Sequence, residues 1–322
     1  MRTLSLKKSL RAIIGEVITF AKQDFHVKSY FYTAFLLIVL LVANYKLGLY
    51  PDWIRNTYFS DDSWWVMPLF YLIIYFLTAI PVLLLRKERD TLKNPGFYLK
   101  SGFFVGLYGL AIGFYKYTDF SFATLTTYEA YFVKLIISQM KCAAFFILPL
   151  ALMKVTIDKQ VNGFYGIARE PKHLDAYFTL FLVMIPFLIL TSFTSDFQKA
   201  YPQFSPWIFD GIFGMNTWEY TLIYEMAYAF DFIMTELIFR GTLVVAVMML
   251  MGRSAVLPMI VFYCSIHFGK PVLEAVSSIL GGYILGALAY QTRHIWGGIM
   301  IHICIALTME IMGFVHYYIL KN

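Results

Sequence analysis

The stretch WWVMPLFYLIIYFLTAIPVLLL, residues 64–85, contains no charged side chain. As an α-helix rising about 1.5 Å per residue, it is long enough to cross the roughly 30 Å hydrocarbon core of a bilayer. The whole chain shares this character, because 60% of its residues are hydrophobic and only 14% are charged. A soluble domain is about one quarter charged. The sequence therefore predicts an all-α, polytopic membrane protein.

Further apolar runs divide the chain into eight or nine predicted transmembrane helices. We find no long linker, no second soluble domain and no repeat of one half by the other. Residues 118–139 could form an interfacial helix or extend a neighbouring span. The predicted spans lie near residues 30–49, 64–85, 102–117, 140–156, 176–194, 217–250, 256–268, 272–291 and 295–319.

The N-terminal segment, residues 1–29, is predicted to be an amphipathic cytosolic helix that lies on an anionic leaflet. Apolar residues recur there at helical spacing, while Lys8 and Arg11 lie off the apolar stripe. A disordered basic tail is the alternative interpretation. The stripe consists of Ile13, Ile14, Val17, Ile18 and Ala21.

Basic residues in the short loops predict the orientation of the chain. The N-terminal segment, residues 86–93, the loop 154–172, Arg253 and Arg293 are basic and would share one side. Residues 51–62 and 195–207 are acidic to neutral and would face the other. We expect an integral protein of the plasma membrane with a cytoplasmic N-terminus. These loops account for the net charge of +6, so no nucleic-acid partner is expected.

The segment DFIMTELIFRG, residues 231–241, places two carboxylates and a guanidinium in an apolar helix. Glu236 and Arg240 are four residues apart on one face, so they can pair, with Arg240 holding the carboxylate in place. Asp231 shares the face of Thr235, one turn away. Ionisable groups within a span are costly and usually face the interior of the bundle. These residues either lock helices together or belong to a functional site.

Two histidines follow in the C-terminal third of the chain. His267 ends a short apolar span in VFYCSIHFGKP, residues 261–271, and His302 lies mid-helix in WGGIMIHICIALTME, residues 296–310. Glutamate and histidine are the side chains needed to deprotonate a water and to polarise a carbonyl. Combined with Glu236, they favour a hydrolytic site over simple packing.

These motifs, in this order, resemble those of the intramembrane CAAX proteases and bacteriocin-processing enzymes, the CPBP or Abi family. The first family motif is Glu-Glu, three residues, Arg and usually Gly, and Thr235–Gly241 matches it except at the first Glu. The second is Phe, three residues, His, which Tyr263 and His267 match with an aromatic change. The third is His, three residues, then Asn or a similar residue, of which His302 matches and Ala306 does not. The resemblance covers roughly residues 220–310, including a GxxxG pattern at Gly282 and Gly286 that favours close helix approach.

The resemblance implies an intramembrane endopeptidase whose catalytic helix core is residues 217–322, preceded by transmembrane helices in residues 30–216. In the family, the first Glu and the second-motif His act on the attacking water, and the third-motif His and Asn stabilise the oxyanion. Carried over to this chain, catalytic roles fall to Glu236, His267 and His302, and positioning roles to Arg240, Thr235 and Tyr263.

The departures from the motifs mean that the site is either rebuilt or inactive. Thr235 cannot act as a base, so either Asp231 delivers a carboxylate from the next turn or Glu236 itself turns inward. Ala306 offers no hydrogen bond. A protonated Glu310, one turn further on, could donate one, or it could be an interface carboxyl near the membrane edge.

Metal dependence stays open from the sequence. Glu236, His267 and His302 could ligate a divalent metal such as zinc, but a purely glutamate-activated water uses the same residues. The chain contains no HExxH, GxSG or GxGD motif of other intramembrane proteases.

The sequence therefore favours an intramembrane endopeptidase that uses a Glu/His-activated water on a peptide or membrane-protein substrate in the lipid bilayer. The alternative is a non-catalytic pseudo-protease of the same fold, acting as a membrane scaffold or immunity factor. A transporter with a midplane ionisable site fits less well, because no repeat is visible. The retained Glu236, Arg240, His267 and His302 favour the enzyme.

Overall fold

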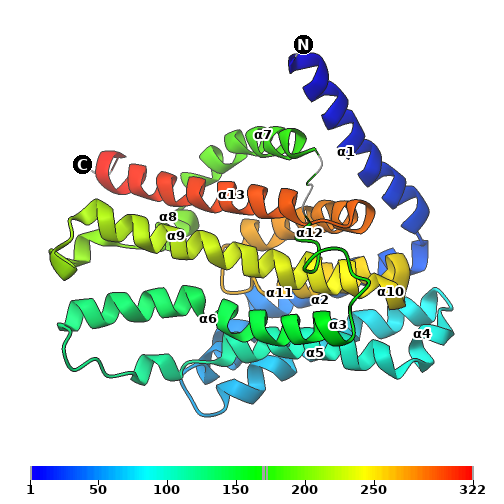
Figure 1. The fold of residues 1–322 in the computed structure, drawn as a ribbon, viewed down its shortest axis with the longest axis horizontal. Helices are drawn as coiled ribbons and strands as arrows, with labels where there is room; N and C mark the ends of the chain where they lie inside the picture. The colour runs from blue at the N-terminus through cyan, green and yellow to red at the C-terminus, as the bar shows by residue number, and fades with distance from the viewer. Residues whose placement is uncertain (1, 169–170, 172, 321–322) are drawn as a thin grey trace.

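A computed structural model of the chain describes residues 2–168, 171 and 173–320, so Lys172 of the predicted basic loop lies outside the described residues. The described residues form helices joined by turns, with one isolated bridge between Phe164 and Ile167. Most helices run side by side along the long axis of the molecule (Figure 1). The main helices are α1 (Arg2–Asp24), α2 (Val27–Leu47), α3 (Ser63–Leu85), α4 (Arg89–Lys93), α5 (Pro95–Gly113), α6 (Thr127–Thr156), α7 (Leu174–Ser192), α8 (Ser195–Ala200), α9 (Thr217–Glu236), a π-helix (Leu237–Ala246), α10 (Met248–Met251), α11 (Val256–Ser265), α12 (Val272–Thr292) and α13 (Trp296–Val315).

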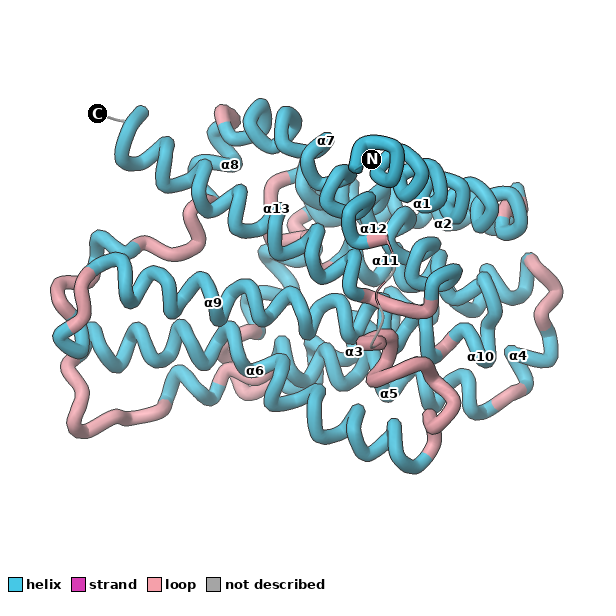
Figure 2. Tube along the Cα trace, turned by 45° about the horizontal axis from the view of Figure 1, so that its top comes forward, coloured by secondary structure: helices cyan, strands magenta, loops and turns pink. Residues whose placement is uncertain are grey.

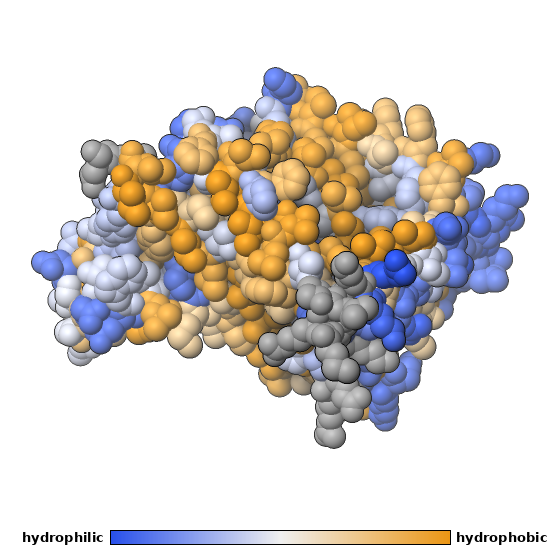
Figure 3. Space-filling model, turned by 90° about the horizontal axis from the view of Figure 1, so that it is seen from above, coloured by the Kyte–Doolittle hydropathy of each residue, from blue (hydrophilic) through white to orange (hydrophobic). Residues whose placement is uncertain are grey.

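The prediction of an all-α polytopic membrane protein is confirmed. The described part of the chain contains 8 helical segments that are long and apolar enough to cross a membrane. On the face shown in Figure 3, hydrophobic side chains cover the middle, and hydrophilic ones gather toward the two ends. Because such a belt needs lipid around it, the chain is an integral membrane protein.

The predicted span 256–268 is the short helix α11. It has 10 residues and rises only about 15 Å, half the thickness of the hydrocarbon core. All of its residues are buried, as are those of the preceding π-helix. A helix that is apolar all round belongs in the interior of a bundle. Helix α11 therefore lies inside the protein and joins α9 to α12.

Two helices begin earlier than their apolar runs predict, because their N-termini are capped. Asn94 caps α5 by accepting a hydrogen bond from the Gly96 N–H at 2.9 Å, and Pro95 occupies the first turn. Thr126 and Glu129 form a capping box at the start of α6. Residues 127–139 therefore extend the fourth span instead of forming a separate interfacial helix.

The N-terminal segment forms the expected helix, α1, but protein covers half of its apolar stripe. Ile13 is buried in a cluster with residues of α7, α12 and α13. Ile14 and Ile18 remain about half exposed. The part of the stripe that was expected to lie on lipid therefore packs partly on the bundle itself.

The basic loops gather at one end of the molecule, as the sequence predicts. Arg86 donates to the Ser254 hydroxyl at 3.2 Å, which joins residues 86–93 to the turn after α10. Asn162 donates to the Arg293 carbonyl at 3.0 Å. Loops and turns lie mainly at the two ends of the bundle (Figure 2). Because the remaining loops occupy the opposite end, the positive charge is strongly asymmetric along the long axis.

Helices α11 and α12 pack closely because α12 presents glycine to α11. A Cβ atom at Gly282 would lie 3.2 Å from Tyr263 Cδ1, and one at Gly286 would lie 2.5 Å from Met259 Cε. The GxxxG pattern therefore permits the close approach that the sequence predicts. Tyr263, the tyrosine of the second motif, therefore packs directly against Gly282.

Candidate active site

Helix α9, the π-helix that continues it, α11 and α13 bring Glu236, Arg240, Tyr263 and His302 together inside the bundle. Arg240 Nη1 donates to Glu236 Oε1 at 2.8 Å, and His302 Nδ1 lies 2.6 Å from the same oxygen. The Tyr263 hydroxyl lies 2.7 Å from His302 Nε2. Glu236 and Arg240 are both fully buried. A continuous polar array thus runs through an otherwise apolar core.

The Glu236–Arg240 pair forms where α9 changes into the π-helix. Glu236 ends α9, and Arg240 lies within the π-helix that starts at Leu237. Such wider turns are rare and occur frequently at functional sites. The pairing of Arg240 with the carboxylate, expected from the four-residue spacing, is present.

His302 connects the pair to α11. A carboxylate oxygen carries only lone pairs, so a ring nitrogen 2.6 Å away must be protonated. Although Nδ1 is this close to Oε1, it forms no hydrogen bond of acceptable angle with any described group. Its N–H bond therefore points away from the line to Oε1. The contact of His302 with Glu236 is therefore mainly electrostatic.

His267 lies in the turn after α11, at the end remote from residues 252–255. Its Nδ1 is 2.9 Å from the Tyr263 carbonyl oxygen, and its ring packs against the Tyr263 ring with centroids 4.9 Å apart. Since a carbonyl oxygen only accepts, Nδ1 carries the proton and Nε2 of a neutral ring carries the lone pair. His267 is half-buried.

Asp231 is not brought to this array. It lies near Cys142 and Lys141 of α6, and its Oδ1 has no hydrogen-bond partner among the described residues. No hydrogen bond or ion pair among the described residues joins Asp231 to Glu236 or to either histidine. The α-helical register explains this, because residue 231 faces a different direction from residue 236.

The structure also shows the surroundings of Thr235 and Ala306, where the chain departs from the family motifs, and of Glu310. Thr235 is half-buried, and Ala306 is buried among aromatic side chains of α6, α9 and the loop before α9. Glu310 accepts hydrogen bonds from the backbone N–H groups of Gln203 at 2.9 Å and Phe204 at 3.5 Å. Glu310 thus ties the loop before α9 to α13, and both of the roles weighed for it stay predictions.

Gly298 of α13 lies directly against Glu236. A Cβ atom there would sit 2.1 Å from Glu236 Oε2, and the carboxylate cannot move aside freely because Arg240 and His302 hold its other oxygen. The third-motif helix can approach the first-motif helix only with glycine at this position.

We expect Gly298→Ala to lower the stability of the folded protein by about 1–3 kcal/mol, the usual cost of overpacking. The matched control is Gly281→Ala, because a Cβ at Gly281 meets no atom within 4 Å. Thermal unfolding in detergent measures both. Equal unfolding temperatures for the two variants would show that Gly298 does not position Glu236.

The residues of the site do not fit the zinc centre that the sequence leaves open. Glu236 Oε1 contacts Arg240 and His302, and Nε2 of His302 contacts the Tyr263 hydroxyl. A cation would have to displace these partners beside a guanidinium. In the part of the chain that the structure describes, no three His, Cys, Asp or Glu side chains are grouped as metal ligands.

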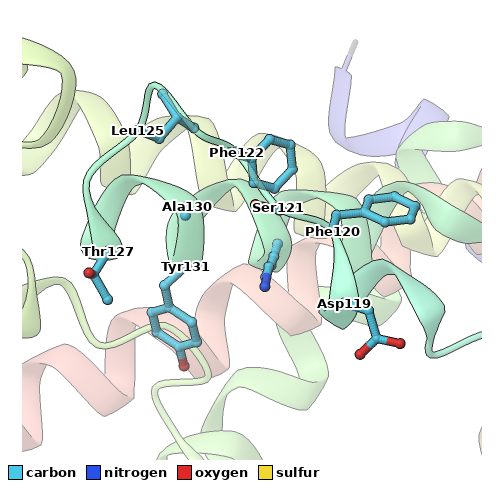
Figure 4. A pocket seen from close by; sticks show the side chains of 9 residues that line it. Asp119, Phe120, Ser121, Phe122, Leu125, Thr127, Ala130 and Tyr131 are labelled. Carbon is cyan, nitrogen blue, oxygen red and sulfur yellow. The ribbon is translucent and has the colours of Figure 1, made fainter.

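A surface pocket of about 590 Å³ lies far from this array along the chain, between the loop before α6 and the first turns of α6 (Figure 4). Asp119, Phe120 and Tyr131 are among its lining residues. A second pocket, of about 560 Å³, lies at the basic end beside Arg86. None of the predicted site residues lines either pocket.

Sequence reasoning missed two features of the site. The Tyr263 hydroxyl is a polar contact to His302, although the match of Tyr to Phe suggests only an aromatic ring. Gly298 is the point of close approach to Glu236, although the sequence shows only a Gly-Gly pair at the start of a helix. The sequence did contain a signal for the Tyr263 contact, because this chain has a hydroxyl where the family motif has the apolar Phe.

Residues 217–308 match the family model described as type II CAAX prenyl endopeptidase Rce1-like. No curated protein and no solved structure matches the chain. The matched segment contains every residue of the array, and it confirms the resemblance found from the motifs. It covers the C-terminal helices and leaves residues 1–216 outside.

Proposed function

We propose that this protein is an intramembrane endopeptidase of the CAAX-protease and bacteriocin-processing type. The observation that carries the proposal is the buried contact of Glu236 with Arg240 and His302 inside the matched segment. Buried ionisable groups in membrane spans are expensive, and a function is the usual reason for keeping them. Its substrate would be a peptide or membrane-protein segment that enters the bilayer.

His267 is the residue that takes the proton of the attacking water in this proposal. Its Nδ1–H is oriented by the Tyr263 carbonyl, which leaves the Nε2 lone pair free to accept a proton. Glu236 is less suited to that step alone, because it is fully buried and Arg240 neutralises its charge. Its role is to hold His302 and Arg240 in place.

Arg240 supplies the positive charge of the site. Nε and Nη2 of Arg240 have no acceptor among the described residues. Preorganised N–H donors in a buried site stabilise the negative charge that develops on the carbonyl oxygen of a peptide during hydrolysis. This arrangement would take over the task that the family assigns to the asparagine, which is Ala306 in this chain.

We also propose that the basic end of the molecule, with the N-terminus, faces the cytoplasm of a plasma membrane. The clustering of the basic loops supports this orientation. Labelling of Arg253→Cys by a membrane-impermeant thiol reagent tests it. The side chain of Arg253 is exposed, so labelling from outside intact cells would reverse the orientation.

The proposed function can be tested at Thr235, where the family has a glutamate, and at Asp231, the carboxylate that could replace it. The role of Asp231 as its substitute stays a prediction, and Asp231→Asn decides it. We expect this nearly isosteric change to leave cleavage almost unchanged, because the contacts of Asp231 are with α6. We expect Thr235→Glu to raise the rate, because it restores the first motif. Cleavage of membrane-delivered peptides by protein in liposomes, read by mass spectrometry, measures both.

The outcomes separate the possible roles. A loss on Asp231→Asn as large as that on Glu236→Gln would make Asp231 a catalytic carboxylate. If Thr235→Glu cleaves the peptides and the wild type does not, the natural chain is a pseudo-protease. If neither protein cleaves them, the peptidase assignment is rejected.

A further inference from the structure

Tyr263 contacts both histidines of the site through different atoms. Its hydroxyl lies 2.7 Å from Nε2 of His302, and its main-chain carbonyl lies 2.9 Å from Nδ1 of His267. Only the first contact depends on the side chain. Tyr263→Phe would therefore remove the contact with His302 and keep the one with His267.

The protons of His302 can be placed from its two neighbours. Nδ1 carries a proton because it lies 2.6 Å from a carboxylate oxygen of Glu236. Arg240 already balances the charge of Glu236, so a second positive charge in the buried site is unfavourable. A neutral imidazole with its proton on Nδ1 has its lone pair on Nε2. The Tyr263 hydroxyl therefore donates to Nε2.

The Tyr263 ring has little freedom to turn toward another partner. It is only 5% exposed, and the Arg240 guanidinium carbon lies 4.1 Å from the ring centroid. Phe239 packs against it edge-on, with centroids 5.1 Å apart. Gly282 faces the ring from α12. These neighbours hold the ring, and with it the hydroxyl, in a fixed position beside His302.

We propose that Tyr263 is a positioning residue whose hydroxyl holds His302 in the neutral tautomer with its proton on Nδ1, the ring nitrogen beside Glu236. Phenylalanine, which the resembling family has at this position, would leave Nε2 of an imidazole that is only 13% exposed without this partner. The ring could then place its proton on Nε2 and present a lone pair to the carboxylate, which would break the array. The importance of this tautomer for hydrolysis rests on the proposed function, but the tautomer itself does not.

Nitrogen NMR of protein labelled with ¹⁵N-histidine, in detergent micelles, tests the proposal without an activity assay. We expect His302 to be protonated at Nδ1 in the wild type and to gain signal for a proton on Nε2 in Tyr263→Phe. A His302→Gln variant assigns the signals. The matched control is Tyr108→Phe, because Tyr108 is also buried and packs on Phe239, yet it contacts neither histidine.

An unchanged His302 tautomer in Tyr263→Phe would overturn the proposal. If Tyr263→Phe does not fold, the wild-type spectrum alone decides. A wild-type His302 with a proton on Nε2 and none on Nδ1 would contradict the proposed tautomer. In an active enzyme, kcat of Tyr263→Phe should fall about tenfold with KM unchanged, since a buried acceptor loses its donor. Absence of cleavage by the wild type would reject the proposed function, whereas the spectra would still decide the role of Tyr263.

Discussion

Arg240→Leu is expected to lower the free energy of unfolding by about 3–5 kcal/mol, because it strands the buried Glu236 carboxylate without its cationic partner. Glu236 is fully buried, and Arg240 is the one Lys or Arg side chain within ion-pair distance of it among the described residues. Folded yield and thermal unfolding in detergent measure this loss. Cleavage should disappear together with stability.

Two further variants show whether the pair itself is responsible. Arg253→Leu removes the same charge from an exposed turn and should leave stability nearly unchanged. Combining Arg240→Leu with Glu236→Gln removes both charges and should recover part of the loss, because no unpaired charge stays buried. Wild-type stability of Arg240→Leu alone would contradict the structural role of the pair.

Much of the fold follows from the sequence because apolar composition and helix length constrain it strongly. Residues 64–85 lack charge and form α3 over nearly the same range, Ser63–Leu85. The starts of α5 and α6 were predicted too late, because caps at Asn94 and Thr126 define them, whereas hydropathy does not. The burial of α1 against α7 and α12 could not be predicted, since an amphipathic stripe looks the same whether it faces lipid or protein.

The candidate site was predictable as a list of residues but not as a set of contacts. The spacing of Glu236 and Arg240 predicts their pairing, because both residues lie on one helix face. Which histidine meets Glu236 depends on how α11 and α13 pack, and it is His302 that lies within 2.6 Å. The distance of Asp231 from the array follows from the packing of α9 on α6 through Cys142, which a single sequence does not show.

His267→Ala is expected to reduce the rate of cleavage by about 10²–10⁴-fold, the usual contribution of a general base. Its folded yield should be preserved, because the imidazole is half-buried and its only hydrogen bond among the described residues is to the Tyr263 carbonyl. A suitable control is His26→Ala, which alters another half-buried imidazole at the cap of α2, outside the matched segment. Its rate should equal that of the wild type.

The most direct test of the central claim is the rate at which wild-type protein and His267→Ala, reconstituted side by side in liposomes, cleave membrane-delivered peptides. The account predicts new peptide termini from the wild type, detected by mass spectrometry, and their near absence from the variant at equal folded protein. Equal cleavage by both proteins would show that the chemistry does not depend on this site. Absence of cleavage from both would show that the chain is not a peptidase for those peptides.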